Sequence, residues 1–172
     1  NFEPKKTDLL AANFTSSRKK PYCKNVLFKT NADGSITVSK QKTFDEQPAS
    51  TSAKLILEDE EYKKGKLLQE HLIRTVTRTG WHLDQLKDWA SDYYNVLSVR
   101  STVQDGQLWI DGQYLDLTPF NIILQDDGQF VIFDQEWDAG EKLPLFYVFF
   151  RGLYYSLGQV NFYASPAGNT PR

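Results

Sequence analysis

The sequence predicts an α+β fold, with a small strand-rich N-terminal part followed by a mainly helical C-terminal part. Near the start, two short runs of alternating polarity flank a turn-forming segment, which is typical of a β-hairpin. Further along, residues 81–99 carry apolar side chains at helical spacing, and residues 145–157 are apolar nearly all round. A chain of 172 residues is one domain's worth and is long enough to enclose a core.

The composition excludes several classes of function. Hydrophobic residues make up 40% of the chain and the net charge is −2, so there is no electrostatic argument for binding nucleic acid or an anionic membrane. The single cysteine, Cys23, excludes an internal disulfide. No apolar run approaches the roughly 18 residues of a membrane span, and no signal peptide opens the chain. We therefore expect a cytoplasmic protein without nucleic acid or membrane partners.

The N-terminal part is expected to contain one hairpin flanked by polar segments. Residues 1–20 are polar and basic, and Leu9–Ala12 within them predict a short helix. Cys23–Lys29 and Ile36–Lys42 are predicted strands, joined by the turn signal Asn-Ala-Asp-Gly. Because side chains alternate along a strand, Lys40 continues the apolar face of the second strand. Such a lysine usually reaches out to solvent at the end of its strand.

The elements that follow are predicted in turn from composition and spacing. Residues 44–52 include a proline and predict a loop, and 54–57 predict a short strand. The acidic stretch 58–65 leads into a helix with leucines at helical spacing over 67–73. The aromatic stripe of 81–99 predicts the central helix of a core.

The stretch Tyr114–Trp137 reads as loop, strand, tight turn, strand and acidic loop. Asn121–Leu124 and Phe130–Phe133 are short apolar runs, and Asp-Asp-Gly between them signals a hairpin turn. An antiparallel hairpin brings its two open ends together, so polar residues before and after it are expected to be neighbours. Oxygen ligands on loops braced by such a ribbon suit a hard cation such as magnesium.

The same stretch resembles a known family. Asp116-x-x-x-x-Asn121, followed by a hairpin and Asp134, is similar to the catalytic loop and metal-binding aspartate of protein kinases and aminoglycoside-type small-molecule kinases. Two departures stand out: Tyr114 occupies the place of the histidine in H-R-D, and Gln-Glu follows the aspartate in place of Phe-Gly. More narrowly, D-L-T-P-F-N-I-I, F-D-Q-E-W and R-G-L resemble kinase-like modules joined to bacterial sugar-modifying methyltransferases and glycosyltransferases.

This resemblance implies a reduced kinase-like fold that binds ATP and Mg²⁺ and phosphorylates a small-molecule or sugar hydroxyl. Asp116 would orient the acceptor hydroxyl and take its proton. Asn121 and Asp134 would hold Mg²⁺, with Glu136 as a further ligand. Lys40, with Lys42 as the second candidate, would hold the α- and β-phosphates and point toward Asp134.

The resemblance also implies a division of the chain. Residues 1–57 would form an N-lobe-like part, 58–65 a hinge-like stretch and 66–160 a C-lobe-like part, with 161–172 as a tail. The Asn1 start and the absence of methionine indicate a fragment of a longer protein, in which a fused transferase domain would be a partner.

Two features argue against activity. The only glycine before Lys40 is Gly34, in a hairpin turn, so a glycine-rich loop over the phosphates is missing. Glu46 is the only glutamate where a kinase helix would pair one with the lysine, and the proline two residues later disfavours that helix. A non-catalytic kinase-like module that binds a nucleotide, a sugar or a partner domain is therefore the alternative.

Two other classes of enzyme have less support. A glycosidase would use Asp116 with Glu136 or Asp134 but has no supporting motif. A methyltransferase site is disfavoured because no glycine-rich loop follows a predicted strand. In the last predicted helix, which is expected to be buried, Arg151 needs a carboxylate partner because an unpaired buried charge is costly.

Overall fold

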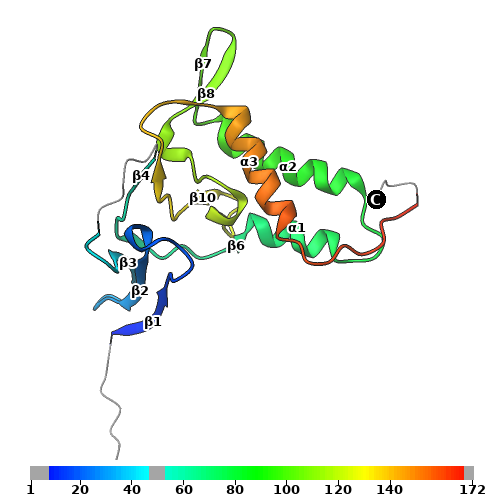
Figure 1. The fold of residues 1–172 in the computed structure, drawn as a ribbon. Coiled ribbons are helices and arrows are strands. Elements are labelled where there is room, and N and C mark those ends of the chain that lie inside the picture. Colours follow the sequence, from blue (N-terminus) through cyan, green and yellow to red (C-terminus); the bar gives the residue numbers. More distant parts are fainter. Residues whose placement is uncertain (1–7, 47–52, 169–172) are drawn as a thin grey trace, which may run out of the picture. The chain divides into compact units, whose positions relative to one another are not determined.

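The structure is a computed structural model that describes residues 8–46 and 53–168. The chain divides into two compact units, residues 1–63 and 64–172. Among the described residues, the first unit contains strands and the second contains three α-helices as well as strands (Figure 1). The predicted α+β class, with a strand-rich N-terminal part and a helical C-terminal part, is confirmed.

The first unit is built on an antiparallel sheet in the order β1-β2-β3-β5. Its strands and its one 3₁₀ turn are β1 (Leu9–Phe14), η1 (Lys20–Tyr22), β2 (Lys24–Thr30), β3 (Ile36–Lys42), β4 (Lys54–Leu55) and β5 (Glu60–Glu61). The predicted hairpin is confirmed as β2 and β3, which pair from Lys24↔Lys42 to Thr30↔Ile36.

Two expectations for this unit need correction or extension. The helix predicted from Leu9 is wrong, because that segment is strand β1. Leucine and alanine favour helices, but pairing with β2 supplies the backbone hydrogen bonds of residues 9–14, and such tertiary pairing overrides a weak local preference. The stretch 58–65 also contains a strand, since β5 pairs with β3 through Val38↔Glu60.

The second unit encloses its core between three helices, α1 (Leu68–Val76), α2 (Leu83–Ser98) and α3 (Leu145–Gly158). The helices predicted over 67–73, 81–99 and 145–157 are thus confirmed. The aromatic stripe of α2 lies in this core, where Trp89 and Tyr93 are almost fully buried. Among the described residues, no helix combines the length and the apolar character needed to cross a membrane.

Two small sheets complete the second unit. Their orders are β10-β9-β6 and β12-β8-β7. The strands and 3₁₀ turns of this unit are β6 (Lys66–Leu67), β7 (Ser101–Gln104), β8 (Gln107–Ile110), η2 (Gly112–Tyr114), η3 (Pro119–Asn121), β9 (Ile122–Leu124), β10 (Phe130–Ile132), β11 (Trp137–Asp138) and β12 (Leu143–Pro144). The hairpin predicted at Asn121–Phe133 is confirmed as β9 and β10. The β7–β8 hairpin extends away from the helices (Figure 1).

The last helix differs from its prediction. It was expected to be buried all round, yet only one stripe, Leu145, Val148, Gly152 and Ser156, is buried. This stripe follows the i, i+3, i+4 spacing by which a helix faces a single neighbour. At Gly152 the helix comes so close to the Tyr93 ring that an added Cβ would overlap it. The opposite side of α3 is exposed and aromatic.

The expected tail at 161–172 also differs, because residues 164–167 return to the junction of α1 and α2. The Trp81 indole nitrogen donates to the Ala164 carbonyl at 2.8 Å. Backbone hydrogen bonds from Ala164 to Val76 (2.9 Å), from Gly80 to Ser165 (2.8 Å) and from Ala167 to Trp81 (2.8 Å) hold the segment in place. These bonds satisfy backbone carbonyls and amides where α1 ends and α2 begins. A segment that contains proline and glycine therefore packs here through its backbone.

Candidate functional site

The loop before β9 is held rigid by its own backbone. It passes through η2 and η3, with a proline opening η3 and hydrogen bonds from Leu117 N to Tyr114 O (3.0 Å) and from Thr118 N to Asp116 O (2.8 Å). Leu117, Thr118 and Pro119 are all buried. A fixed φ at Pro119 and three successive buried residues after Asp116 limit how far this part of the loop can move.

Asn121 connects the loop before β9 with the residue that follows β10. Its side-chain nitrogen donates to the Asp116 carbonyl at 2.9 Å and lies 3.3 Å from both Asp116 Oδ2 and the Asp134 carbonyl. Backbone carbonyls can only accept hydrogen bonds, so the nitrogen must be the amide atom that faces them. The Asn121 Oδ1 atom therefore points away from these acceptors, with a direction that the protein fixes.

Asp134 follows β10 in an unusual backbone conformation. The last ladder bond runs from Phe133 N to Asn121 O at 3.1 Å, and the chain then turns with a φ of 52° at Asp134. A positive φ is uncommon for residues other than glycine, although aspartate and asparagine tolerate it best. Such conformations gather at functional sites, where the surrounding structure holds them in place.

Arg151, on α3, contacts the other side of Asp116. Its Nη1 and Nη2 nitrogens each lie 3.3 Å from Asp116 Oδ1, and Nη1 also donates to the Leu115 carbonyl at 3.0 Å. The guanidinium lies 5.1 Å from the centre of the Tyr155 ring. The predicted carboxylate partner of Arg151 is thus confirmed, and the Asp116 carboxylate is fixed between an amide and a guanidinium.

Tyr93 supports this arrangement from the core, and sequence reasoning assigned it only to the apolar stripe. Its hydroxyl oxygen lies 2.8 Å from Leu117 O and 3.0 Å from Val148 O, so the hydroxyl can donate its hydrogen bond to either carbonyl. Burial raises the pKa of Tyr93 well above its ordinary value, while the charge of Arg151 lowers it and that of Asp116 raises it. A buried tyrosine needs a hydrogen-bond partner for its hydroxyl. A tyrosine within an apolar helical stripe therefore indicates that an acceptor lies nearby.

Glu136 is placed differently from the other acidic candidate residues. Its side chain is buried, with 1% of the residue exposed, whereas Asp116 and Asp134 are half-buried. Within residues 8–46 and 53–168, no three Asp, Glu, His or Cys side chains form a group that could hold a metal ion. Asp116, Asp134 and Glu136 therefore do not form a carboxylate cage, and a cation here would need amide oxygens and ligand oxygens as well.

The lysine candidate lies in the first unit and has an acidic partner. Lys40 Nζ lies 2.7 Å from Glu60 Oε1, and its ammonium-bearing side chain is 5% exposed. Glu60 stands opposite Val38 in the β3–β5 ladder, diagonal to Lys40 on the same face. Glu46, weighed from the sequence as the only possible partner, instead pairs with Lys20 at 3.4 Å. The second candidate, Lys42, is exposed.

No family model, curated protein or solved structure matches this chain. The kinase-like family, the roles of the five candidate residues and the approach of Lys40 to Asp134 stay predictions.

Proposed function

We propose that this chain is a kinase-like domain that binds ATP with Mg²⁺ and transfers a phosphoryl group to the hydroxyl of a small molecule or sugar. The observation that carries the proposal is the Asn121 amide. It contacts Asp116 and Asp134 together, which gathers the acceptor-side and metal-side residues of the resembled family at one end of one hairpin.

The donor set at this end of the hairpin fits Mg²⁺. This ion usually takes one or two protein carboxylates and completes its shell with waters and substrate phosphates, so an all-protein cage is not needed. Asp134 would supply the anionic oxygen, and Asn121 would supply Oδ1, the amide atom turned away from the backbone acceptors. When bound, the ion would neutralise charge on the nucleotide phosphates.

Asp116 would act on the acceptor hydroxyl. One carboxylate oxygen faces Arg151 and the other faces Asn121, so the carboxylate cannot rotate freely. Holding a hydroxyl in a fixed direction is most of what phosphoryl transfer asks of a protein. Asp116 would accept the hydrogen bond of that hydroxyl and then its proton.

Lys40 would hold the α- and β-phosphates. Its partner Glu60, 2.7 Å away, fixes the position of the ammonium on this face of the sheet, as a helix glutamate does in the resembled family. Glu136, which is buried, would be a further carboxylate ligand of the ion, as the resemblance implies.

The test is calorimetric titration of the chain with ATP in the presence and absence of Mg²⁺. Asp134→Asn keeps the shape and tolerates the positive φ but removes the charge, so we expect Mg²⁺-dependent binding to be abolished with the melting temperature nearly unchanged. The matched control is Asp126→Asn, the same change in the exposed turn of the same hairpin, which should bind as wild type does. Equal affinity of wild type and Asp134→Asn would rule out the metal role.

Asp116→Asn separates binding from transfer. Because Asp116 is assigned to the acceptor hydroxyl, ATP binding should survive while transfer to a panel of sugar and small-molecule hydroxyls stops. Loss of binding in this variant would place Asp116 with the nucleotide and overturn its assigned role.

A second candidate is a non-catalytic kinase-like module that regulates a fused methyltransferase or glycosyltransferase. The observation in its favour is the guanidinium of Arg151 on Asp116, which occupies an oxygen that an acceptor hydroxyl would use. Gly34, the only glycine before Lys40, has a φ of 84° in the β2–β3 turn, so no glycine-rich loop lies on that strand pair. Absence of Mg²⁺–ATP binding by the wild-type protein would favour this module over an active kinase.

A further inference from the structure

One side of α3 is aromatic, uncharged and open to solvent. Spacings of three and four residues bring four of its positions into one stripe, with Tyr147 beside them. The exposed fractions of these residues are 70% for Phe146, 50% for Tyr147, 59% for Phe150, 66% for Tyr154 and 38% for Leu157. We call these five residues the aromatic face. Contiguous exposed apolar surface of this kind marks an interaction site.

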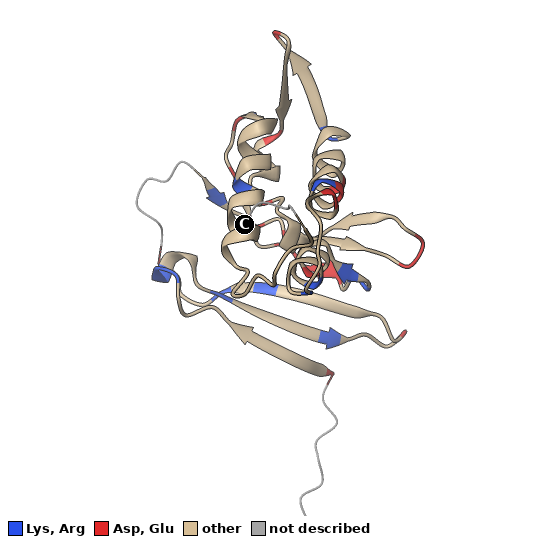
Figure 2. Cartoon of the chain, turned by 90° about the vertical axis from the view of Figure 1, so that its right-hand side faces the viewer, with Lys and Arg blue, Asp and Glu red and all other residues tan. Residues whose placement is uncertain are grey.

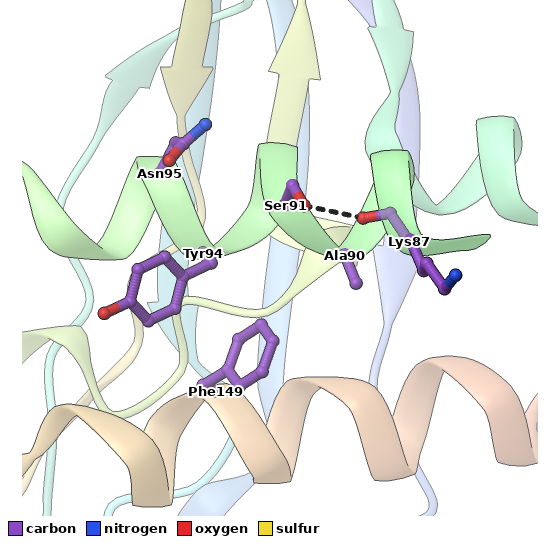
Figure 3. A pocket seen from close by; sticks show the side chains of 6 residues that line it. All are labelled: Lys87, Ala90, Ser91, Tyr94, Asn95 and Phe149. Atoms are coloured by element: carbon purple, nitrogen blue, oxygen red, sulfur yellow. Dashed lines mark hydrogen bonds between the residues drawn. The ribbon is translucent and has the colours of Figure 1, made fainter. Parts of the chain in front are cut away.

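A groove of about 390 Å³ lies beside the aromatic face, between α2 and α3. Its α2 side is lined by Lys87, Ala90, Ser91, Tyr94 and Asn95, and Phe149 lines it from α3 (Figure 3). The Phe149 ring meets Tyr94 edge-on at 5.5 Å and lies 6.4 Å from the Phe146 ring. The groove is therefore continuous with the aromatic face.

The charge pattern indicates what kind of partner fits. Arg151 is the only charged residue of α3, and its guanidinium contacts Asp116. The lysine of the groove, Lys87, pairs with Asp84 at 2.8 Å. Elsewhere in the described residues, basic and acidic side chains are both present (Figure 2). An interfacial membrane helix needs basic residues beside its apolar side, and a charged peptide needs an opposite charge; the aromatic face offers neither.

We propose that this surface is where a second copy of the chain docks, with α3 of one copy against α3 of the other. At their exposed fractions, the five side chains present roughly 600 Å² of largely apolar surface. Two copies would together bury about 1,200 Å², which is the lower end of the range of standard interfaces. Aromatic residues without charge are the composition of homodimer interfaces.

A two-fold contact also needs a surface that complements itself. Here projecting rings and a groove lie side by side, so the rings of each copy can enter the groove of the other by one symmetry operation. The tyrosine hydroxyls give the apolar contact a polar rim, which is the usual anatomy of such an interface. The docking surface is separate from the residues of the proposed function, so each can fail without the other.

Sedimentation velocity over a range of concentrations tests the proposal on the full chain. Wild type should be dimeric, and Phe150→Glu should raise the dimer dissociation constant at least about 100-fold, since a charge would be buried in an apolar contact. The control is Phe14→Glu on β1, whose side chain is exposed to a similar extent, 64%, and which should stay dimeric. Melting curves of both variants establish that each is folded.

A cysteine substitution provides an independent measurement. Cys23, the only natural cysteine, is buried at 4% exposure, so Phe150→Cys would present a single accessible thiol. Mild oxidation should give a disulfide-linked dimer for Phe150→Cys and none for Phe14→Cys. A wild-type chain that stays monomeric at all concentrations, or a Phe150→Glu variant as dimeric as wild type, would overturn the proposal. Binding of a monomer to phosphatidylcholine vesicles would assign the surface to lipid instead.

Discussion

Two buried aromatic residues of the second unit and one buried lysine of the first satisfy their polar groups in different ways. In the second unit the Trp89 indole donates to Leu68 O at 2.9 Å and the Tyr93 hydroxyl donates to Leu117 O at 2.8 Å, so both neutral groups end on backbone carbonyls. In the first unit the Lys40 ammonium is paired with a carboxylate, that of Glu60, at 2.7 Å.

This difference distinguishes residues that stabilise the fold from a residue with a candidate function. A buried indole or phenol adds a large apolar surface and one satisfied hydrogen bond, so it stabilises the fold. A buried ion pair recovers little more than its desolvation cost, and apolar residues of the same size often serve as well. Trp89 and Tyr93 are therefore explained by stability, whereas Lys40 is not, in keeping with the phosphate role proposed for it.

The largest effect is expected at Trp89. Trp89→Ala removes a side chain of 2% exposure and leaves a cavity beside the start of α1, so the free energy of unfolding should fall by about 3–5 kcal/mol. Urea unfolding followed by circular dichroism measures this. Val103→Ala, at an exposed position of the β7–β8 hairpin (70%), is the control and should change stability by less than about 0.5 kcal/mol.

Tyr93→Phe is expected to have the next largest effect. The carbonyls of Leu117 and Val148 lose their donor, so the free energy of unfolding at pH 8 should fall by about 1–3 kcal/mol. Burial raises the pKa of Tyr93 above its ordinary value of 10.0. The protonated Tyr93 hydroxyl therefore contributes fully to the free energy of unfolding below pH 10, the ordinary pKa of tyrosine. This contribution is lost as the pH rises above 10 toward the raised pKa of the folded protein.

The dependence of stability on pH above pH 9 reveals the contribution of Tyr93. Between pH 9 and pH 11 the stability of Tyr93→Phe should decline less than that of wild type, as measured by thermal melts across that range. Parallel profiles for the two proteins would show that Tyr93 titrates alike in the folded and unfolded chain.

A smaller effect is expected at Asp134, where the backbone has a φ of 52°. Asp134→Ala places a residue that tolerates positive φ poorly there and should lower stability by about 1 kcal/mol. Asp134→Gly should be at least as stable as Asp134→Ala, because glycine adopts this region freely. Differential scanning calorimetry of the two variants gives the difference, and Asp134→Ala as the more stable protein would contradict the strain argument.

The smallest effect on stability is expected for the lysine pair. Replacing both partners, Lys40→Met with Glu60→Leu, should change the free energy of unfolding by less than about 1 kcal/mol. The same double variant should lose Mg²⁺–ATP affinity if the proposed function holds. A stability loss above about 3 kcal/mol would make the pair structural and remove the contrast between the two units.

Local signals in the sequence predicted much of the fold. The β9–β10 hairpin has an Asp-Gly turn between β-branched runs, and α2 has an aromatic stripe at helical spacing. The β7–β8 hairpin also has an Asp-Gly turn, Asp105-Gly106, but the sequence around it does not predict two strands. Both residues have positive φ, 50° and 74°, as the tightest hairpin turns require. Only the second strand, β8, has an apolar run, because three of the four residues of β7 are polar.

What sequence reasoning could not supply depends on contacts distant along the chain. Glu60 becomes the partner of Lys40 only through the β3–β5 register, which no local pattern specifies. The contact of Asn121 with the Asp134 carbonyl depends on the backbone turn at Asp134. The exposure of the aromatic face was also unpredictable, because composition does not reveal how many neighbours a helix will have.

Because residues 164–167 contact Trp81, this contact can form only after those later residues have been synthesised. The indole of Trp81 precedes its acceptor, the Ala164 carbonyl, by 83 positions. A ribosome that adds 5–20 residues per second needs about 4–17 s to make that stretch. Throughout this interval the junction of α1 and α2 lacks its cover, so a chain still being synthesised exposes an indole that the finished protein hides. The α1–α2 junction therefore stays open to solvent or to a chaperone until residues 164–167 have been added.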